Sequence, residues 1–241
     1  MESWLKAATD YIPGWLEYQM RLIDQPGCVV AVAYKGRVIL EQALGVADIS
    51  TNKALTPRHR FRVASHSKSF TSAAIFKLRQ AGRLRLDDPA GRYVDGLHPL
   101  VAEATIGQLL SHSAGLIRDG ADAGQWQDRR PFLGEKELRA ALKEAPAIEA
   151  GTRLKYSNHG FGLLGLIIEA VTGEPYYDWV RREIIAAAKL GETDADAPAP
   201  RGAPLARGHS RKLPLGKRLI VPGDNKIHAL APATGFISTA G

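Results

Sequence analysis

The sequence predicts an α+β fold, in which an antiparallel sheet is flanked by helices and accompanied by a mostly helical region. Residues 28–47 form two β-rich runs around a tight-turn dipeptide, and one amphipathic segment precedes them. From residue 65 to 191, by contrast, apolar residues recur at the spacing of helices. Because a lone hairpin is only marginally stable, we expect further strands to pair with it in the folded protein.

The N-terminal elements follow from hydrophobic periodicity and turn residues. Residues 3–24 are predicted to form a helix with a break at Pro13, since an internal proline removes a helical hydrogen bond. The apolar side of this helix comprises Trp4, Leu5, Trp15, Leu16 and Met20. The hairpin turns at Lys35 and Gly36, and the polar residues 50–60 are predicted to form a loop.

Helices dominate the middle of the chain. The first spans about sixteen residues and stops at Gly82, and its later turns are expected to bury Phe70, Ala73, Ala74 and Leu78. Residues 83–94 form a turn-rich connection. Further helices are predicted at 105–116, 135–146, 158–173 and 176–191, ended by Gly115, Pro146, Gly173 and Gly191. The Pro- and Gly-rich residues 194–226 are predicted to be a loop, so the chain does not return to strands.

Three regions result from this order of elements. Residues 1–58 hold the N-terminal helix and the hairpin, residues 59–193 form the mostly helical region, and residues 194–241 form a loop-rich segment. A chain of 241 residues can bury a sizeable core. Its composition, with 45% hydrophobic and 24% charged residues, is ordinary for a soluble globular protein.

Several classes of protein are disfavoured by composition. No window approaches eighteen uninterrupted apolar residues, and the N-terminus lacks the basic start and apolar run of a signal peptide, so we expect a cytoplasmic protein without a membrane partner. The single Cys28 excludes an internal disulfide and is interpreted as a small buried hydrophobe. Much of the net charge of +7 lies in residues 201–218, which are broken by Pro and Gly and contain no aromatics for base stacking. We therefore expect a solvated loop there and no nucleic-acid partner.

Three Ser-x-x-Lys pairs are candidates for a nucleophile and its base. Ser3 and Lys6 lie near the terminus, whereas Ser50 and Lys53 lie in a polar loop without burial to alter a lysine. The third pair begins a helix whose later turns are apolar, and its members are Ser65 and Lys68.

The third pair has three physical advantages. Residues three apart on a helix share a face, so the Lys68 amine can reach the Ser65 hydroxyl. The helix N-terminus favours a developing alkoxide, and both the helix dipole and burial favour the neutral lysine that a general base requires. The alternative is that Ser65 caps the helix and that Lys68 is solvated.

A second motif is Tyr156-x-Asn158, which occurs once in the chain. The tyrosine could pass a proton, and the asparagine amide could hold a substrate carbonyl or a lysine. The alternative is a turn in which Asn158 caps the following helix and Tyr156 packs in the core. By itself, the motif favours the alternative.

Other catalytic and cofactor-binding patterns are absent from the sequence. There is no Gly-x-Ser-x-Gly elbow, no His-Glu-x-x-His, no Cys-rich cluster and no Gly-rich phosphate loop after a strand. The seven histidines show no ligand spacing, and His112 is interpreted as a structural hydrogen-bonding group. We therefore expect no metal and no cofactor.

Taken together, four ordered segments resemble the serine β-lactamase and penicillin-binding-protein superfamily, in particular the class C β-lactamases with their related esterases, D-aminopeptidases and DD-peptidases. These segments are "PGCVVAVAYKGRVILEQALGVAD", "FRVASHSKSFTSAAIFKLRQAGRLRLDDPAGRYV", "TIGQLLSHSAGL" and "EAGTRLKYSNHGFGLLGLIIEAVTGEPY", and "GFISTAG" is similar to a later stretch of the family. The resemblance covers nearly the whole chain and implies a class C β-lactamase-like fold.

The resemblance also implies roles for the residues of both motifs. Ser65 would be the acylated nucleophile, Lys68 its base partner, Tyr156 a proton shuttle, and Asn158 a contact to substrate or lysine. The Ser65 amide would supply half of the oxyanion hole. Ser67, Ser69 and Ser72 are then expected to be packed or solvated.

The sequence departs from the family pattern in one respect. The family's third motif, Lys-Thr-Gly or His-x-Gly on a central strand, follows the "STAG" block, and Gly241 is the last residue here. We therefore expect the C-terminal strands to be missing from this chain and a second polypeptide to supply them, with the hairpin edge paired to another chain. Residues 1–241 alone are expected to be insoluble or inactive.

Two functions of different classes are consistent with the sequence. The first is an acyl hydrolase that forms an acyl-enzyme on Ser65. Among its candidate substrates, carboxylic esters rank first, amides such as D-amino-acid peptides second, and β-lactams third. The second is a non-catalytic binding module on the same fold.

Overall fold

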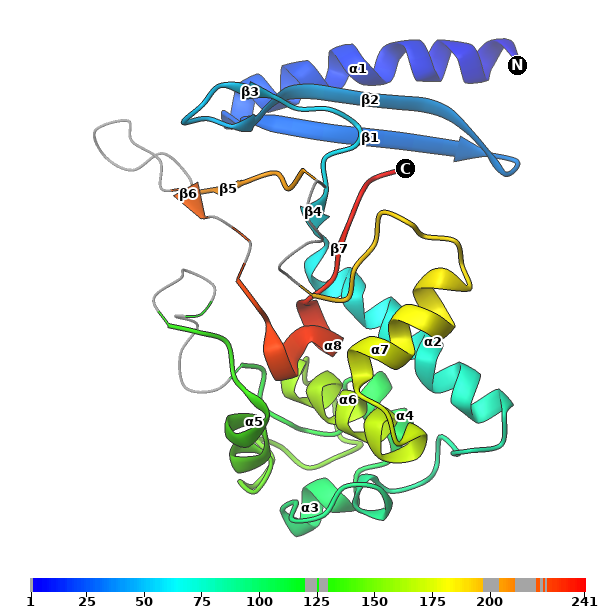
Figure 1. Cartoon of the computed structure of the whole chain (residues 1–241), viewed down its shortest axis with the longest axis vertical. Helices are drawn as coiled ribbons and strands as arrows, with labels where there is room; N and C mark the ends of the chain where they lie inside the picture. Colours follow the sequence, from blue (N-terminus) through cyan, green and yellow to red (C-terminus); the bar gives the residue numbers. More distant parts are fainter. Residues whose placement is uncertain are drawn as a thin grey trace. The chain divides into compact units, whose positions relative to one another are not determined.

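The computed structural model (Figure 1) describes residues 2–119, 125, 130–196, 204–210, 220–221, 223 and 225–241. Its residues cluster into two compact units. The first unit combines residues 1–61, 199–224 and 238–241, and the second combines residues 62–198 and 225–237, as far as these are described. Each unit therefore contains segments that are far apart in the sequence.

The first unit is built around the predicted hairpin. Strands β1 (Gly27–Tyr34) and β2 (Arg37–Asp48) pair antiparallel, and both turn residues have positive φ angles, 48° at Lys35 and 76° at Gly36. A pair of left-handed residues matches the twist of the flanking strands, which is why this dipeptide closes the hairpin. The helix α1 (Ser3–Ile23) runs alongside these strands (Figure 1).

One expectation for the first unit is wrong, and a second is met only in part. The helix α1 is not broken at Pro13, because the φ angle of proline is itself helical and only one hydrogen bond is lost. Of the predicted apolar side of α1, Leu5 is buried, whereas Trp4 and Trp15 are exposed. The helix therefore anchors to its unit through fewer apolar residues than the pattern predicts.

The hairpin also has a partner strand within the chain. Strand β3 (Lys53–Ala54) pairs with β2 in the stretch predicted to be a loop, so the sheet has the order β1-β2-β3. Strands β5 (Gly208–His209) and β6 (Ile220–Val221) form a second small antiparallel pair. Strands of two residues have no alternation of apolar and polar residues, so the sequence of residues 194–226 does not indicate them.

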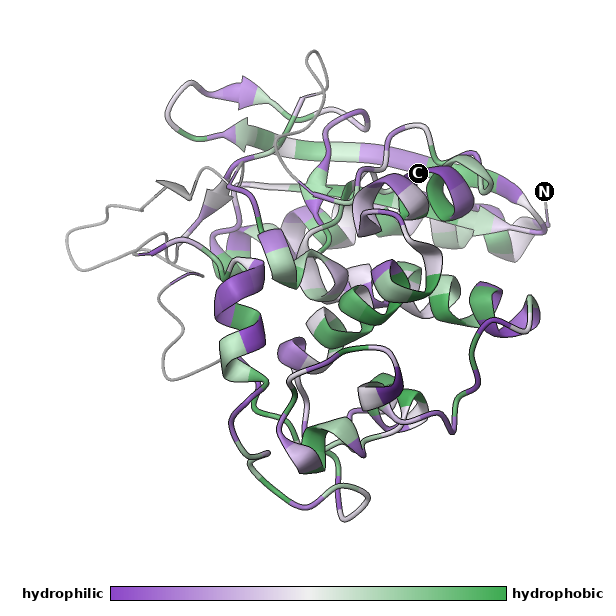
Figure 2. Ribbon diagram, turned by 60° about the horizontal axis from the view of Figure 1, so that its bottom comes forward, coloured by the Kyte–Doolittle hydropathy of each residue, from purple (hydrophilic) through white to green (hydrophobic). Residues whose placement is uncertain are grey.

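The second unit is organised around α6 (Asn158–Thr172), whose residues from Asn158 to Ile168 are all buried. Helices α2 (Ser67–Gln80), α4 (Ile106–Leu110) and α8 (Ala231–Thr234) pack against it. Figure 2 shows hydrophobic residues along the helices of this unit. Helix α6 ends where predicted, because Gly173 adopts a left-handed φ of 74°.

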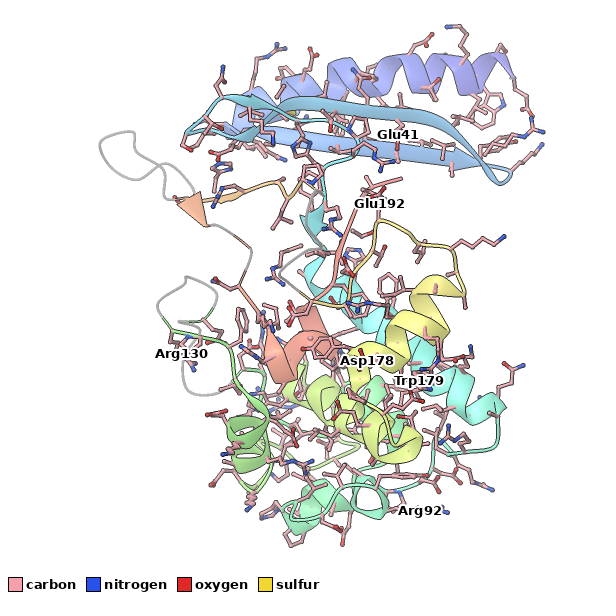
Figure 3. All side chains as sticks on the ribbon, in the orientation of Figure 1. Glu41, Arg92, Arg130, Asp178, Trp179 and Glu192 are labelled. Atoms are coloured by element: carbon pink, nitrogen blue, oxygen red, sulfur yellow. The ribbon has the colours of Figure 1, made fainter. Side chains whose placement is uncertain are left out.

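Shorter elements complete the second unit. Trp179, labelled in Figure 3, is buried in its core. The remaining helices are α3 (Pro99–Ala102), α5 (Glu135–Ala141) and α7 (Tyr176–Val180), with 3-10 turns at Ala64–His66, Ala90–Arg92 and His228–Leu230 and a π-helical turn at Arg181–Ala186. Two further strands, β4 (Phe61–Arg62) and β7 (Ile237–Ser238), each have one residue in either unit.

Apart from α6, the predicted helices of this unit exist but are shorter than expected. The helix expected at 105–116 ends at Leu110, because His112 and Gly115 have positive φ angles of 57° and 75° and turn the chain. The helix expected at 135–146 ends at Ala141, and that at 176–191 changes to a π-helical turn. In α2, Ala74 and Leu78 are buried as expected, Phe70 is partly buried, and Ala73 is exposed.

Two further expectations concern surfaces. No helix among the described residues combines the length and the apolar character that a bilayer crossing needs. Of the basic residues 201–218, those at 201–203 and 211–218 lie outside the described part of the chain, so the prediction of a solvated loop is not addressed there.

Candidate active site

Ser65 lies in the 3-10 turn that leads into α2, one turn earlier than the α-helix in which it was expected. The turn is held by Ser67, whose buried hydroxyl donates to the carbonyl of Ala64 at 2.5 Å and accepts from the amide of Phe236 at 3.0 Å. Ala64 has a φ of 46°, a strained value for a residue with a Cβ atom. The Ser65 side chain is exposed, so the turn presents its hydroxyl at the surface of the unit.

Lys68 is buried at the start of α2, with 8% of its surface exposed. Its Nζ donates to Asn158 Oδ1 at 2.7 Å and to the backbone carbonyl of Ala233 in α8 at 2.8 Å. The distance from Nζ to Ser65 Oγ is 3.5 Å. The spacing of three residues thus brings the amine to the hydroxyl, because residues i and i+3 also share a face in a 3-10 turn.

Tyr156 completes the contacts of the hydroxyl. The distance between Tyr156 Oη and Ser65 Oγ is 2.5 Å, and Lys68 Nζ lies 4.7 Å from the centre of the Tyr156 ring. The structure therefore brings together all four residues that the sequence analysis singled out, including Asn158.

The other two Ser-x-x-Lys pairs show no comparable arrangement. Lys6 is exposed and pairs with Asp10 at 2.5 Å, and the Ser50 hydroxyl donates to Asp48 at 2.6 Å. Both pairs lie in the first unit, whereas the four candidate residues lie in the second.

The beginning of α6 explains how Asn158 becomes available. Ser157 caps the helix, because its Oγ accepts from the amide of Gly160 at 2.9 Å. Asn158 is therefore the first residue of the helix instead of its cap, and its side chain is 3% exposed and directed at Lys68. Its Nδ2 donates to Asp119 Oδ1 at 2.5 Å.

Sequence reasoning missed three groups that contact the candidate residues. Asp119 is buried and pairs with Arg118, whose Nε lies 3.0 Å from Asp119 Oδ2, and the third group is the carbonyl of Ala233. The Arg118 guanidinium lies 5.5 Å from the centre of the Tyr156 ring. Arg118 and Asp119 are adjacent, but no recognised motif links this pair, or the distant carbonyl of Ala233, to Ser65 and Lys68, so the sequence contains no signal for them.

His112 packs on the site without contacting the Ser65 hydroxyl. Its ring centre lies 4.3 Å from that of Tyr156, and its Nδ1 accepts from the Ser157 amide at 3.2 Å. Burial lowers the pKa of His112, and the positive charge of Lys68 lowers it further. A neutral, hydrogen-bonded imidazole is consistent with the structural role expected for this residue.

The pKa of Lys68 is lowered, and burial is the main cause. Tyr156 and the carboxylate of Asp119 act in the opposite direction and raise this pKa, whereas the positive charge of Arg118 lowers it. The balance favours a neutral amine at a lower pH than in an exposed lysine, which is the state that can accept a proton.

The backbone of Ser65 is also available. Its amide donates to no group within the described part of the chain. A backbone amide without an intramolecular acceptor is free to donate to a bound group. Among the described residues, no group of His, Cys, Asp and Glu side chains could hold a metal ion.

Comparison with known proteins identifies the family of the chain. The family model described as Beta-lactamase matches residues 17–241. The chain belongs to the beta-lactamase family. Protein flp of Staphylococcus aureus (strain MW2) is 28% identical over 172 residues, and penicillin-binding protein 4* of Bacillus subtilis (strain 168) is 28% identical over 167 residues. Each match covers 68% of this chain but only 34% and 37% of the respective relative.

Solved structures show the same fold. The octameric penicillin-binding protein homologue from Pyrococcus abyssi has a TM-score of 0.83 at 25% identity, over 95% of this chain and 53% of that one. A class C beta-lactamase from Rhodobacter sphaeroides has a TM-score of 0.76 at 29% identity, over 93% and 60%. The predicted class C β-lactamase-like α+β fold and the predicted superfamily are confirmed. This chain spans about half the length of the two solved neighbours.

Proposed function

We propose that the protein is a serine acyl hydrolase that forms an acyl-enzyme on Ser65 and acts on carboxylic esters. The observation that carries the proposal is the pair of contacts at the Ser65 hydroxyl, 2.5 Å from Tyr156 Oη and 3.5 Å from the buried Lys68 Nζ. A serine hydroxyl is a weak nucleophile unless a base removes its proton, and these two groups are within reach to do so.

In the proposed reaction, the Ser65 oxygen attacks the ester carbonyl carbon while its proton passes to Lys68, directly or through the Tyr156 hydroxyl. The Ser65 amide supports the charge on the carbonyl oxygen. The same proton then goes to the departing alkoxide as the ester C–O bond breaks, which leaves an acyl group on Ser65. Water attacks this acyl group by the same proton path, releases the carboxylic acid and restores the hydroxyl.

D-aminopeptidase, DD-peptidase or β-lactamase activity is the alternative within the same chemistry. SurE, a 28% identical neighbour with a TM-score of 0.73, has been solved with D-Leu. This favours D-amino-acid amides as the second candidate substrates. A non-catalytic binding module on the same fold is the alternative of another class.

A fluorophosphonate probe tests the proposed chemistry directly. The protein, purified in complex with the second polypeptide proposed below, should be labelled, and labelling should disappear in Ser65→Ala but persist in the matched control Ser50→Ala. Turnover of p-nitrophenyl acetate should follow the same pattern and fall by several orders of magnitude in Lys68→Ala. An unlabelled wild-type protein would support the binding module.

The substrate class is tested by comparing kcat/KM for p-nitrophenyl acetate, D-alanine p-nitroanilide and a chromogenic cephalosporin. A higher value for the ester supports the esterase, and a higher value for the anilide supports the D-aminopeptidase. A preference for the cephalosporin would instead assign the protein as a β-lactamase.

A second polypeptide that completes the sheet is also part of the proposal. Within the described part of the chain, β1 is an edge strand that pairs only with β2, and an open apolar edge is a site for strand addition. Size-exclusion chromatography with mass spectrometry of the purified protein tests this point. A monomer containing one polypeptide would contradict it.

A further inference from the structure

Asp119 is a buried carboxylate placed directly behind the candidate catalytic groups. It is 8% exposed, its Oδ1 accepts from Asn158 Nδ2, and its Oδ2 pairs with Arg118 Nε at 3.0 Å. The amide of Asn158 also donates to the Arg118 carbonyl at 3.0 Å, so the backbone holds these residues together. A charge this deeply buried is costly unless it is paired, and both of its oxygens have partners here.

The chemistry of Asp119 determines which way the Asn158 amide faces. An ionised carboxylate only accepts hydrogen bonds, whereas an asparagine side chain has one donating end and one accepting end. Asn158 must therefore present Nδ2 to Asp119 and its Oδ1 to Lys68, which is the arrangement observed at 2.7 Å.

The orientation of Asn158 in turn determines where the lone pair of Lys68 points. A neutral amine has two N–H groups and one lone pair. Two acceptors, Asn158 Oδ1 and the carbonyl of Ala233, lie 2.7 and 2.8 Å from Nζ and take the two N–H groups. The remaining direction is left for the hydroxyls of Ser65 and Tyr156, and Ser65 Oγ lies 3.5 Å from Nζ. A reversed Asn158 amide would offer Lys68 a donor, and the lone pair would be drawn away from Ser65.

We infer that Asp119 is a positioning residue, which acts through Asn158 to aim the Lys68 lone pair at the Ser65 hydroxyl. This inference rests on the proposed function, because it concerns how the same site is prepared for proton transfer. The chain of contacts runs from an acceptor-only carboxylate through an amide of defined orientation to a base.

The charges that face Lys68 give this arrangement a measurable signature. Asp119 and Tyr156 raise the pKa of Lys68, and Arg118 lowers it. His112 also faces the amine and has a lowered pKa, and α8 contributes only the uncharged carbonyl of Ala233. Asp119 and Arg118 are therefore an ion pair whose members act on Lys68 with opposite sign.

The experiment measures the rate of Ser65 phosphonylation by a fluorophosphonate against pH in wild type, Asp119→Asn, Asp119→Glu and Arg118→Gln. In Asp119→Asn the orientation of Asn158 is no longer enforced, so the maximal rate should fall about threefold to tenfold. Loss of the negative charge should also move the acidic limb of the profile to lower pH. Asp119→Glu, which keeps the acceptor and the charge, should recover part of the rate and the position of the limb.

Arg118→Gln is the matched control, because it breaks the same ion pair and removes the opposite charge. Its acidic limb should move to higher pH. If both variants shift the limb in the same direction, or if Asp119→Asn matches wild type, the inference is wrong and Asp119 is structural. If Asp119→Asn does not fold, Arg118→Gln decides by itself, since an unmoved or lowered limb would overturn the inference. Failure of the proposed function is separate, because wild type would then not be phosphonylated on Ser65.

Discussion

Gly165 in the middle of α6 allows α8 to approach the base, and Gly165→Ala tests how closely packing and chemistry are coupled. A Cβ atom at this position would lie 2.4 Å from Pro232 Cγ and 3.3 Å from Pro232 Cβ. Carbon atoms pack at about 3.5–4.0 Å, so α8 must retreat by about 1 Å. The proline ring is rigid and cannot rotate away, and the residue that follows it, Ala233, accepts a hydrogen bond from Lys68 at 2.8 Å.

The expected magnitudes follow from this displacement. Overpacking costs about 1–3 kcal/mol, and replacing a helical glycine by alanine returns about 1 kcal/mol, so the free energy of unfolding should fall by about 0–2 kcal/mol. This corresponds to a decrease in Tm of a few degrees, at about 2–4 °C per kcal/mol for a protein of this size. Activity should fall further, by about tenfold to a hundredfold, because a shift of about 1 Å removes the acceptor that orients the Lys68 amine.

Gly160→Ala in the same helix is the control. Its Cβ would meet Ser157 Oγ at 3.5 Å, an ordinary contact, so Tm should be unchanged or slightly raised and activity retained. Thermal unfolding followed by circular dichroism and p-nitrophenyl acetate turnover are measured on both variants. Equal stability and equal activity of Gly165→Ala and Gly160→Ala would refute the reasoning.

Three further predictions address the site and its support. Tyr156→Phe should lower ester turnover at least about a hundredfold with little change in Tm, since only a hydroxyl is removed, and full activity would show that Tyr156 is merely packed. Because burial lowers the pKa of Lys68 and only the neutral amine accepts a proton, the acidic limb of kcat/KM should lie below the ordinary lysine pKa of 10.5, and a limb at or above that value would contradict this assignment. Thr71→Val should lower the free energy of unfolding by about 1–3 kcal/mol, measured by denaturant unfolding. The buried Thr71 hydroxyl lies 2.7 Å from both Tyr176 Oη and the carbonyl oxygen of Pro232, and valine removes both hydrogen bonds. The exposed Ser69→Ala on the same helix should have almost no effect, and a similar loss in both variants would argue against a specific role of the Thr71 hydrogen bonds.

The sequence by itself determined the elements whose cause is local. Lys35 and Gly36 closed the hairpin because the turn needs two positive φ angles, and Gly173 ended α6 because it can adopt the left-handed conformation. The apolar run of α6 was long enough to identify a buried helix. The sequence also identified the candidate nucleophile and base, because two residues spaced three apart on a helical turn lie on the same face.

Only the tertiary structure decided what surrounds those two residues. The sequence left open whether Asn158 capped its helix or contacted the lysine, and the capping bond of Ser157 with the contact to Lys68 answered this. Asp119 lies in a loop and Ala233 in the short helix α8, far apart in sequence, yet both are linked to Lys68, Asp119 through Asn158 and Ala233 directly.

The physical reason is the range of the interactions involved. Periodicity and turn chemistry depend on neighbouring residues, so they can be read along the chain. The protonation and direction of the Lys68 amine depend on burial and on acceptors brought in by α6 and α8, and the sequence contains no local record of that packing.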